Sequence, residues 1–186
     1  MWMIPGAPER KFHQPEGPAL QVTDGSVIAG YASLFGRKDQ GGDVVQKGAY
    51  AISLKAMAAA GRGVKMLWQH DPTQPIGVWD EVREDATGLY VKGRILTEVE
   101  KGREAAALLA AGAIDGLSIG YRTVKAERDG KGQRLLSELE LWEVSLVTFP
   151  MLPEARVAAK GESLDAAMWA DLAAIFEDAR LSLAGR

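Results

Sequence analysis

Residues 116–150 read GLSIGYRTVKAERDGKGQRLLSELELWEVSLVTFP and decide the fold class. Apolar and polar residues alternate over 117–126 and again over 133–149, which is the period of a β-strand. Between these runs, Asp129-Gly130-Lys131-Gly132 has the composition of a tight turn. The stretch therefore predicts a long β-hairpin that ends at Pro150, because proline cannot donate a ladder hydrogen bond.

Similar patterns lie upstream of this hairpin. Strands are predicted at 27–35, 64–68, 76–82 and 89–95. The last two are joined by a turn at 85–88, and Pro72 is expected to end regular structure after the second. Helices are predicted at 49–60 and 99–111, each followed by a glycine. Six or seven strands, mostly in hairpins, with two helices predict a mainly β, α+β protein built as a closed antiparallel β-barrel surrounded by helices.

The chain divides into three parts. Residues 1–25 contain four prolines and three glycines and are predicted to form a flexible N-terminal arm. Residues 26–157 are predicted to form the barrel domain. Residues 158–186 are predicted to be a linker and a C-terminal amphipathic helix, which runs from about Leu164 to Leu183.

Composition excludes several function classes. The 186 residues carry a formal net charge of −3, which argues against a basic nucleic-acid clamp. Without cysteine, the chain cannot form disulfides, thiol nucleophiles or thiolate metal sites. The only histidines are His13 and His70, and no metal or cofactor is predicted. There is no apolar run of membrane-spanning length and no signal-peptide pattern, so the protein is expected to stay in the cytoplasm.

Ser118 lies in Gly116-Leu117-Ser118-Ile119-Gly120, which fits the G-x-S-x-G pattern of α/β-hydrolases. That fold needs a helix directly after the serine and a histidine later in the chain. A strand pattern follows Ser118 and no histidine does, so the hydrolase interpretation is rejected. The flanking glycines are instead expected to leave room for a substrate backbone beside a strand serine. The alternative is an ordinary serine on a half-buried strand.

Two further residues could act with Ser118. His70 ends an apolar strand and is either a base facing a cleft or a loop-end hydrogen-bonding group, while His13 lies in the predicted arm. A turn centred between Gly130 and Lys131 places Glu143 opposite Ser118. A shift of the pairing by two positions would keep both on one face, whereas a shift by one would separate them.

The surroundings expected for Glu143 make its carboxylate unusual. By strand alternation it shares a face with Leu135, Leu139, Leu141 and Val147. A carboxylate on an apolar face needs a partner, and an imidazole is a suitable one. The alternative is a glutamate at the end of the barrel that reaches solvent.

Five blocks occur in an order and spacing that resemble the prohead maturation proteases of tailed phages. They are Gly30–Phe35 (GYASLF), Lys47–Tyr50 (KGAY), Leu67–Asp71 (LWQHD), Gly116–Tyr121 (GLSIGY) and Trp142–Pro150 (WEVSLVTFP). The resemblance covers roughly residues 26–157. The sequence departs from the family pattern at Met151-Leu152, where a small residue and asparagine are more usual.

This resemblance implies a serine endopeptidase with a fold like the herpesvirus capsid-assembly protease, assemblin. By block matching, Ser118 would be the nucleophile and His70 the base. Glu143 would complete a triad, with a Ser–His dyad as the alternative. The implied substrates are the major capsid protein with its scaffolding segment, and the chain itself. The implied location is the assembling prohead in the bacterial host's cytoplasm.

The resemblance leaves other assignments open. A homodimer is a further option, and neither nucleic acid nor membrane is an expected partner. The alternative function is a catalytically inactive barrel that serves as a structural or scaffold-binding module of the prohead, because folds can outlive their sites.

Overall fold

The structure is a computed structural model that describes residues 22–23 and 26–156. His13, the predicted 158–186 segment with its helix, and nearly all of the predicted arm lie outside the described residues. No helix that the structure describes is both long and apolar enough to span a membrane.

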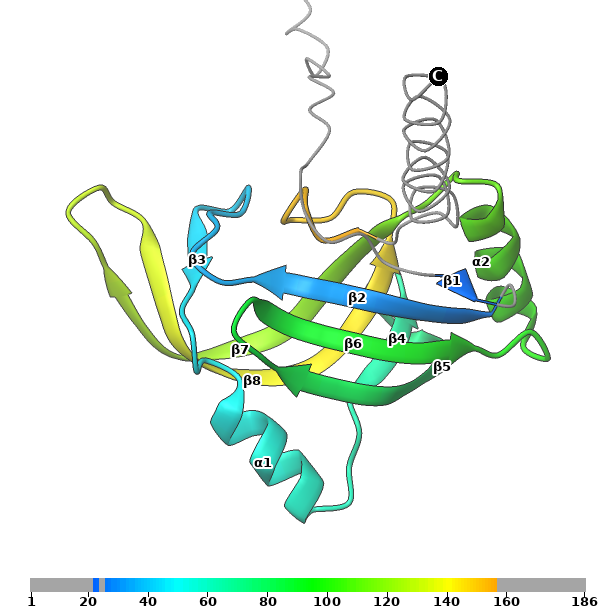
Figure 1. Ribbon diagram of the computed structural model, residues 1–186, viewed down its shortest axis with the longest axis horizontal. Helices are drawn as coiled ribbons and strands as arrows, with labels where there is room; N and C mark the ends of the chain where they lie inside the picture. The colour runs from blue at the N-terminus through cyan, green and yellow to red at the C-terminus, as the bar shows by residue number, and fades with distance from the viewer. Residues whose placement is uncertain (1–21, 24–25, 157–186) are drawn as a thin grey trace, which may run out of the picture.

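The described chain forms one sheet of eight strands with two helices (Figure 1). The strands are β1 (Val22–Thr23), β2 (Val27–Leu34), β3 (Asp43–Val45), β4 (Lys65–Trp68), β5 (Asp71–Glu84), β6 (Gly88–Ile95), β7 (Gly116–Arg128) and β8 (Arg134–Val147). The helices are α1 (Ala51–Ala59) and α2 (Glu100–Ala110). The predicted hairpins and both predicted helices are therefore confirmed, with ends that differ by a few residues.

The predicted closed antiparallel barrel of six or seven strands is wrong. The sheet runs in the order β1-β2-β6-β5-β4-β8-β3, with β7 on β8, and curls into an open half-barrel (Figure 1). Among the described strands no ladder joins β2 to β7. The sheet is also mixed, because β3 and β4 both pair parallel to β8. Strand β3 pairs with 134–136 of β8 and β4 with 143–146, and α1 lies between these two strands in the chain.

Two local expectations also differ from the structure. Strand β3 was not expected, because three residues are too few to show a period. Pro72 does not end regular structure, since it lies inside β5. The β4–β5 ladder shifts register on both sides of Leu67, which pairs with Pro75. Such irregular positions are where a strand tolerates a missing backbone N–H.

Strand β8 lies between β7 and the parallel strands β3 and β4, and it changes its core-facing side along its length. Leu139 and Leu141 belong to the buried core, but farther along the core residues are Val144 and Leu146. Trp142 causes the change, since it is an extra residue between the pairs Tyr121–Leu141 and Gly120–Glu143.

This bulge corrects the expected surroundings of Glu143. Its carboxylate does not share a face with the core leucines 139 and 141. Glu143 and Ser145 instead lie on the face that is turned away from the core, opposite Gly120 and Ser118 of β7.

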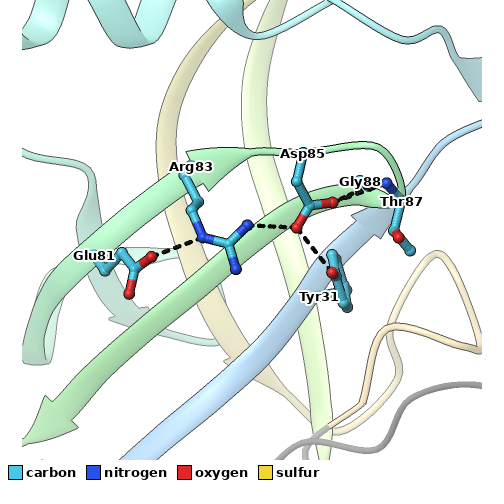
Figure 2. A network of polar contacts seen from close by, with 6 residues as sticks. All are labelled: Tyr31, Glu81, Arg83, Asp85, Thr87 and Gly88. Carbon is cyan, nitrogen blue, oxygen red and sulfur yellow. Dashed lines mark hydrogen bonds and ion pairs between the residues drawn. The ribbon is translucent and has the colours of Figure 1, made fainter.

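A polar network fixes the β5–β6 turn to β2 (Figure 2). The Asp85 carboxylate accepts hydrogen bonds from the Tyr31 hydroxyl at 2.8 Å and from Arg83 Nη1 at 2.5 Å. It also accepts the backbone N–H groups of Thr87 and Gly88 at 2.8 and 3.2 Å. Burial opposes the charge, but these donors outweigh it and lower the pKa of Asp85 to about 2.

Candidate active site

Ser118 and Glu143 occupy one face of the β7–β8 ladder. Ser118 pairs with Ser145, and Glu143 pairs with Gly120. The pairing therefore differs by two positions from direct opposition of Ser118 and Glu143, which makes the two residues diagonal neighbours. The bulge at Trp142 is needed for this arrangement, because without the extra residue they would lie on opposite faces.

The glycines beside Ser118 do not leave room for a substrate backbone, and that expectation is wrong. A Cβ atom on Gly120 would overlap the carboxylate of Glu143. At Gly116, a Cβ atom would lie 2.6 Å from the carbonyl oxygen of Val147 and 2.8 Å from Cδ of Pro150. Protein atoms fill both spaces, and at Gly120 the missing side chain makes room for Glu143.

His70 is presented by a strained turn. Gln69 and His70 form a two-residue connection between β4 and β5, with φ angles of 52° and 62°. Positive φ at both central residues is the pattern of a type I′ hairpin turn, which favours glycine and asparagine. For other side chains this conformation costs about 1–3 kcal/mol per residue and persists where surrounding contacts enforce it.

Contacts with β8 hold this turn. The Gln69 N–H donates to the carbonyl of Leu146 at 2.9 Å. The Gln69 side-chain amide donates to Thr148 Oγ1 at 2.7 Å and accepts the Thr148 N–H at 3.3 Å. The His70 N–H donates to Ser145 Oγ at 3.2 Å. Four hydrogen bonds thus fasten two strained residues to β8 and to Thr148, which directly follows it.

The imidazole of His70 contacts Glu143. The distance from His70 Nδ1 to Glu143 Oε1 is 2.6 Å, and the two side chains are 41% and 10% exposed. The other carboxylate oxygen, Oε2, accepts the Ser145 hydroxyl at 2.5 Å. Glu143 therefore does not reach out to solvent. With Nδ1 facing the carboxylate, Nε2 is the ring nitrogen available to another group.

Ser118 is 5% exposed and lines a cavity of about 110 Å³. The cavity wall is mostly apolar on one side, with Leu34 of β2 and Met151 and Leu152 of the loop after β8. Within the described residues, no hydrogen bond joins the Ser118 hydroxyl to His70. The structure thus brings His70 and Glu143 into contact. Ser118 lies on the neighbouring strand β7, opposite Ser145 and two residue pairs along the ladder from Glu143.

The polar side of the cavity includes Tyr121 and Asp43. Asp43 accepts Arg134 Nη2 at 2.9 Å and the Tyr121 hydroxyl at 3.1 Å. Burial, followed by the negative charge of Asp43, raises the pKa of Tyr121 to about 12, so its hydroxyl stays protonated at neutral pH. In 22–23 and 26–156, no group of three or more acidic or histidine side chains is placed to hold a metal ion.

Ser145 is the site residue that the sequence analysis missed. It contacts both the backbone of His70 and the carboxylate of Glu143 and is fully buried. Its position two residues after Glu143, on the same face of a strand, was the available signal.

A known protein family matches most of the chain. The family model described as caudovirus prohead serine protease matches residues 16–168. The chain belongs to the caudovirus prohead serine protease family. The resemblance predicted from the five sequence blocks is thereby confirmed.

Two phage proteases are similar to the chain. The chain is 32% identical to the prohead protease of Enterobacteria phage HK97 over 136 residues, and this match covers 72% of the chain. The chain spans 59% of that relative's length. The structure of the bacteriophage T4 capsid assembly protease matches with a TM-score of 0.52 at 16% identity, covering 65% of this chain and 82% of that one. This second likeness shows a shared fold.

Proposed function

We propose that the chain is a serine endopeptidase of phage capsid maturation, with Ser118 as nucleophile, His70 as base and Glu143 as the orienting acid. The observation that carries the proposal is the 2.6 Å contact between Glu143 and His70 Nδ1, on the sheet face that also holds Ser118. Family membership supports the same reaction class.

The proposed chemistry follows from the roles of the three side chains. Ser118 Oγ attacks the scissile carbonyl carbon while His70 Nε2 takes the hydroxyl proton. His70 then gives this proton to the leaving amine as the C–N bond breaks, which leaves an acyl group on Ser118. A water molecule, deprotonated by His70, then attacks the acyl carbon. His70 returns this proton to Ser118 Oγ as the ester C–O bond breaks, which releases the acid product and restores the serine. Glu143 keeps the proton on Nδ1 and stabilises the imidazolium that forms in each step.

The cavity beside Ser118 is the proposed site for a substrate side chain. Its volume of about 110 Å³ and the lining by Leu34, Met151 and Leu152 favour an apolar group. The proposed substrates are the major capsid protein with its scaffolding segment, and the chain itself, inside the prohead in the host cytoplasm. A homodimer remains part of the proposal as an option.

One observation favours the second candidate, an inactive structural or scaffold-binding module. Within the described residues the Ser118 hydroxyl has no hydrogen bond to His70. Catalytic hydrogen bonds of substrate-free enzymes are often long and tighten when substrate binds, so the first candidate is still preferred. Cleavage by the folded wild-type chain distinguishes the two.

The test is cleavage of the chain itself and of a capsid protein with its scaffolding segment, followed by intact mass. The wild type should produce fragments, whereas Ser118→Ala and His70→Ala should each lose at least about 10³-fold in rate. Ser137→Ala is the matched control, because Ser137 is an exposed serine of β8, and it should cleave normally. Circular dichroism should be unchanged in all variants.

Two results would overturn the proposal. A folded wild type that cleaves neither substrate favours the inactive module. A His70→Ala variant that keeps more than a few per cent of the wild-type rate shows that His70 is structural.

A further inference from the structure

Ser145 joins the two groups that the proposed mechanism needs to keep together. Its hydroxyl donates to Glu143 Oε2 at 2.5 Å and accepts the backbone N–H of His70 at 3.2 Å. We infer that Ser145 is a positioning residue that locks the His70 turn and the Glu143 carboxylate onto each other. This inference rests on the proposed function, but its structural part can be tested without any turnover.

These contacts use the proton of the Ser145 hydroxyl and one of its two lone pairs. A serine hydroxyl has one proton to donate and lone pairs to accept with. The proton goes to Glu143 and a lone pair takes the His70 N–H. The residue is 0% exposed, so water cannot replace either bond without a rearrangement.

The same contacts separate the roles of the two serines that face each other across the ladder. Ser145 is closed to solvent, and its proton is committed to a carboxylate. Ser118 is its direct pair on β7, is slightly exposed and lines the cavity. Only Ser118 is therefore placed to meet a substrate, and Ser145 acts through His70 and Glu143.

Backbone strain explains why a positioning residue is needed here. His70 has a φ of 62°, a conformation that persists only where neighbouring contacts enforce it. The His70 N–H donates to Ser145 Oγ at 3.2 Å. Without that bond the turn can relax, and the imidazole then moves relative to the carboxylate that orients it.

The first experiment compares Ser145→Ala with a matched control, Ser53→Ala. Ser53 is also a buried serine, and it accepts a backbone N–H of β8, that of Leu141 at 2.9 Å, but it lies on α1 away from the site. Both variants should melt a few degrees lower than the wild type. Ser145→Ala should lower kcat about 10- to 100-fold with little change in KM, because a misplaced catalytic group lowers the rate of the chemical step. Ser53→Ala should keep kcat.

Rescue and spectroscopy separate positioning from plain destabilisation. Ser145→Thr keeps the hydroxyl and should be faster than Ser145→Ala at a similar melting temperature. In a Ser118→Ala background labelled with ¹⁵N, the Nδ1–H proton of His70 should give a low-field resonance, which His70→Gln assigns. Adding Ser145→Ala should remove or shift this resonance, and adding Ser53→Ala should not.

The positioning role of Ser145 and the proposed protease function can fail separately. If the wild type does not cleave but Ser145→Ala shifts the resonance, the positioning role stands and the protease proposal falls. An unchanged resonance in Ser145→Ala, or kcat losses equal to those of Ser53→Ala, would overturn the positioning role whatever the wild-type activity.

Discussion

Glu143 has both carboxylate oxygens occupied, one by His70 Nδ1 and the other by the Ser145 hydroxyl. A carboxylate held on two sides cannot rotate freely, so its negative charge stays directed at the imidazole. This is the arrangement expected of a group that favours an imidazolium during proton transfer.

The first prediction concerns that charge. Glu143→Gln should keep the fold and lower kcat about 10³- to 10⁴-fold, because a neutral amide no longer favours the imidazolium. Glu143→Asp keeps the charge, loses only reach and should be faster than the glutamine variant. Steady-state kinetics on a capsid-derived peptide measures both, with Glu138→Gln on the same strand as the control. A Glu143→Gln variant as fast as the wild type would leave a Ser–His dyad.

Residue-level prediction from the sequence had a clear physical limit. Ser118, His70 and Glu143 could be nominated because histidine is scarce and because a hairpin turn fixes which residues face each other. The positive φ angles of Gln69 and His70 could not be predicted from the sequence, because neither residue type favours that conformation. Ser145 was missed because a serine on a strand is ordinary until its contacts are known.

At the scale of elements, the β7–β8 hairpin was predictable from its alternation, but its internal register was not. The ladder shifts at three places, and the shift at Trp142 turns Glu143 away from the core. A bulge adds a single residue and has no consistent sequence signature here, so the simple odd–even rule assigned Glu143 to the wrong face.

The second prediction tests this register. Gly120→Ala places a Cβ atom against the carboxylate of Glu143, which must then leave its contact with His70. We expect kcat to fall about 10²-fold, as misplacement by about 1 Å can do, while the circular dichroism spectrum stays unchanged. Gly130→Ala, at a hairpin position with open space around it, is the matched control and should be as active as the wild type. Full activity in Gly120→Ala would contradict the placement of Glu143.

The third prediction concerns the β5–β6 turn and pH. The pKa of Asp85 is lowered from 3.8 to about 2, so between these values the unfolded chain binds more protons than the folded chain. The stability that Asp85 contributes is fully present above about pH 4 and is lost as the pH falls towards 2. Urea unfolding at several pH values measures how the free energy of unfolding changes with pH. Its decrease between about pH 4 and pH 2 should be smaller in Asp85→Asn than in the wild type. Asp80 forms a half-exposed pair with Arg94, and Asp80→Asn should show the same decrease as the wild type. An equal decrease in both variants would contradict this prediction.

At the scale of the whole molecule, the open sheet could not be foreseen. Closure depends on whether β2 and β7, which lie far apart in the sequence, form a ladder, and no local pattern encodes that. The two parallel pairings with β8 were also hidden, because β3 and β4 are only three and four residues long. A fold like the herpesvirus protease stays a prediction.

The fourth prediction concerns the ends of the chain. The Ala155 carbonyl accepts the Leu117 N–H at 2.7 Å, and Arg156 contacts Asp115 at 2.6 Å. We therefore expect a 21–157 fragment to fold with a melting temperature close to that of the full chain. A 21–150 fragment loses these contacts and should melt well below it. If 21–157 is unfolded, the residues removed from one or both ends are an integral part of the domain.

The central claim is that Ser118 is the nucleophile activated by His70, and labelling with a fluorophosphonate tests it most directly. The reagent loses fluoride and forms a phosphonyl ester with an activated serine. Trypsin places Ser118 in peptide 104–122 and Ser145 in peptide 135–156, so mass spectrometry locates the adduct. We predict one adduct, on Ser118, in the folded wild type and none in His70→Ala. An adduct on Ser145, or equal labelling of Ser118 in His70→Ala, would contradict the claim.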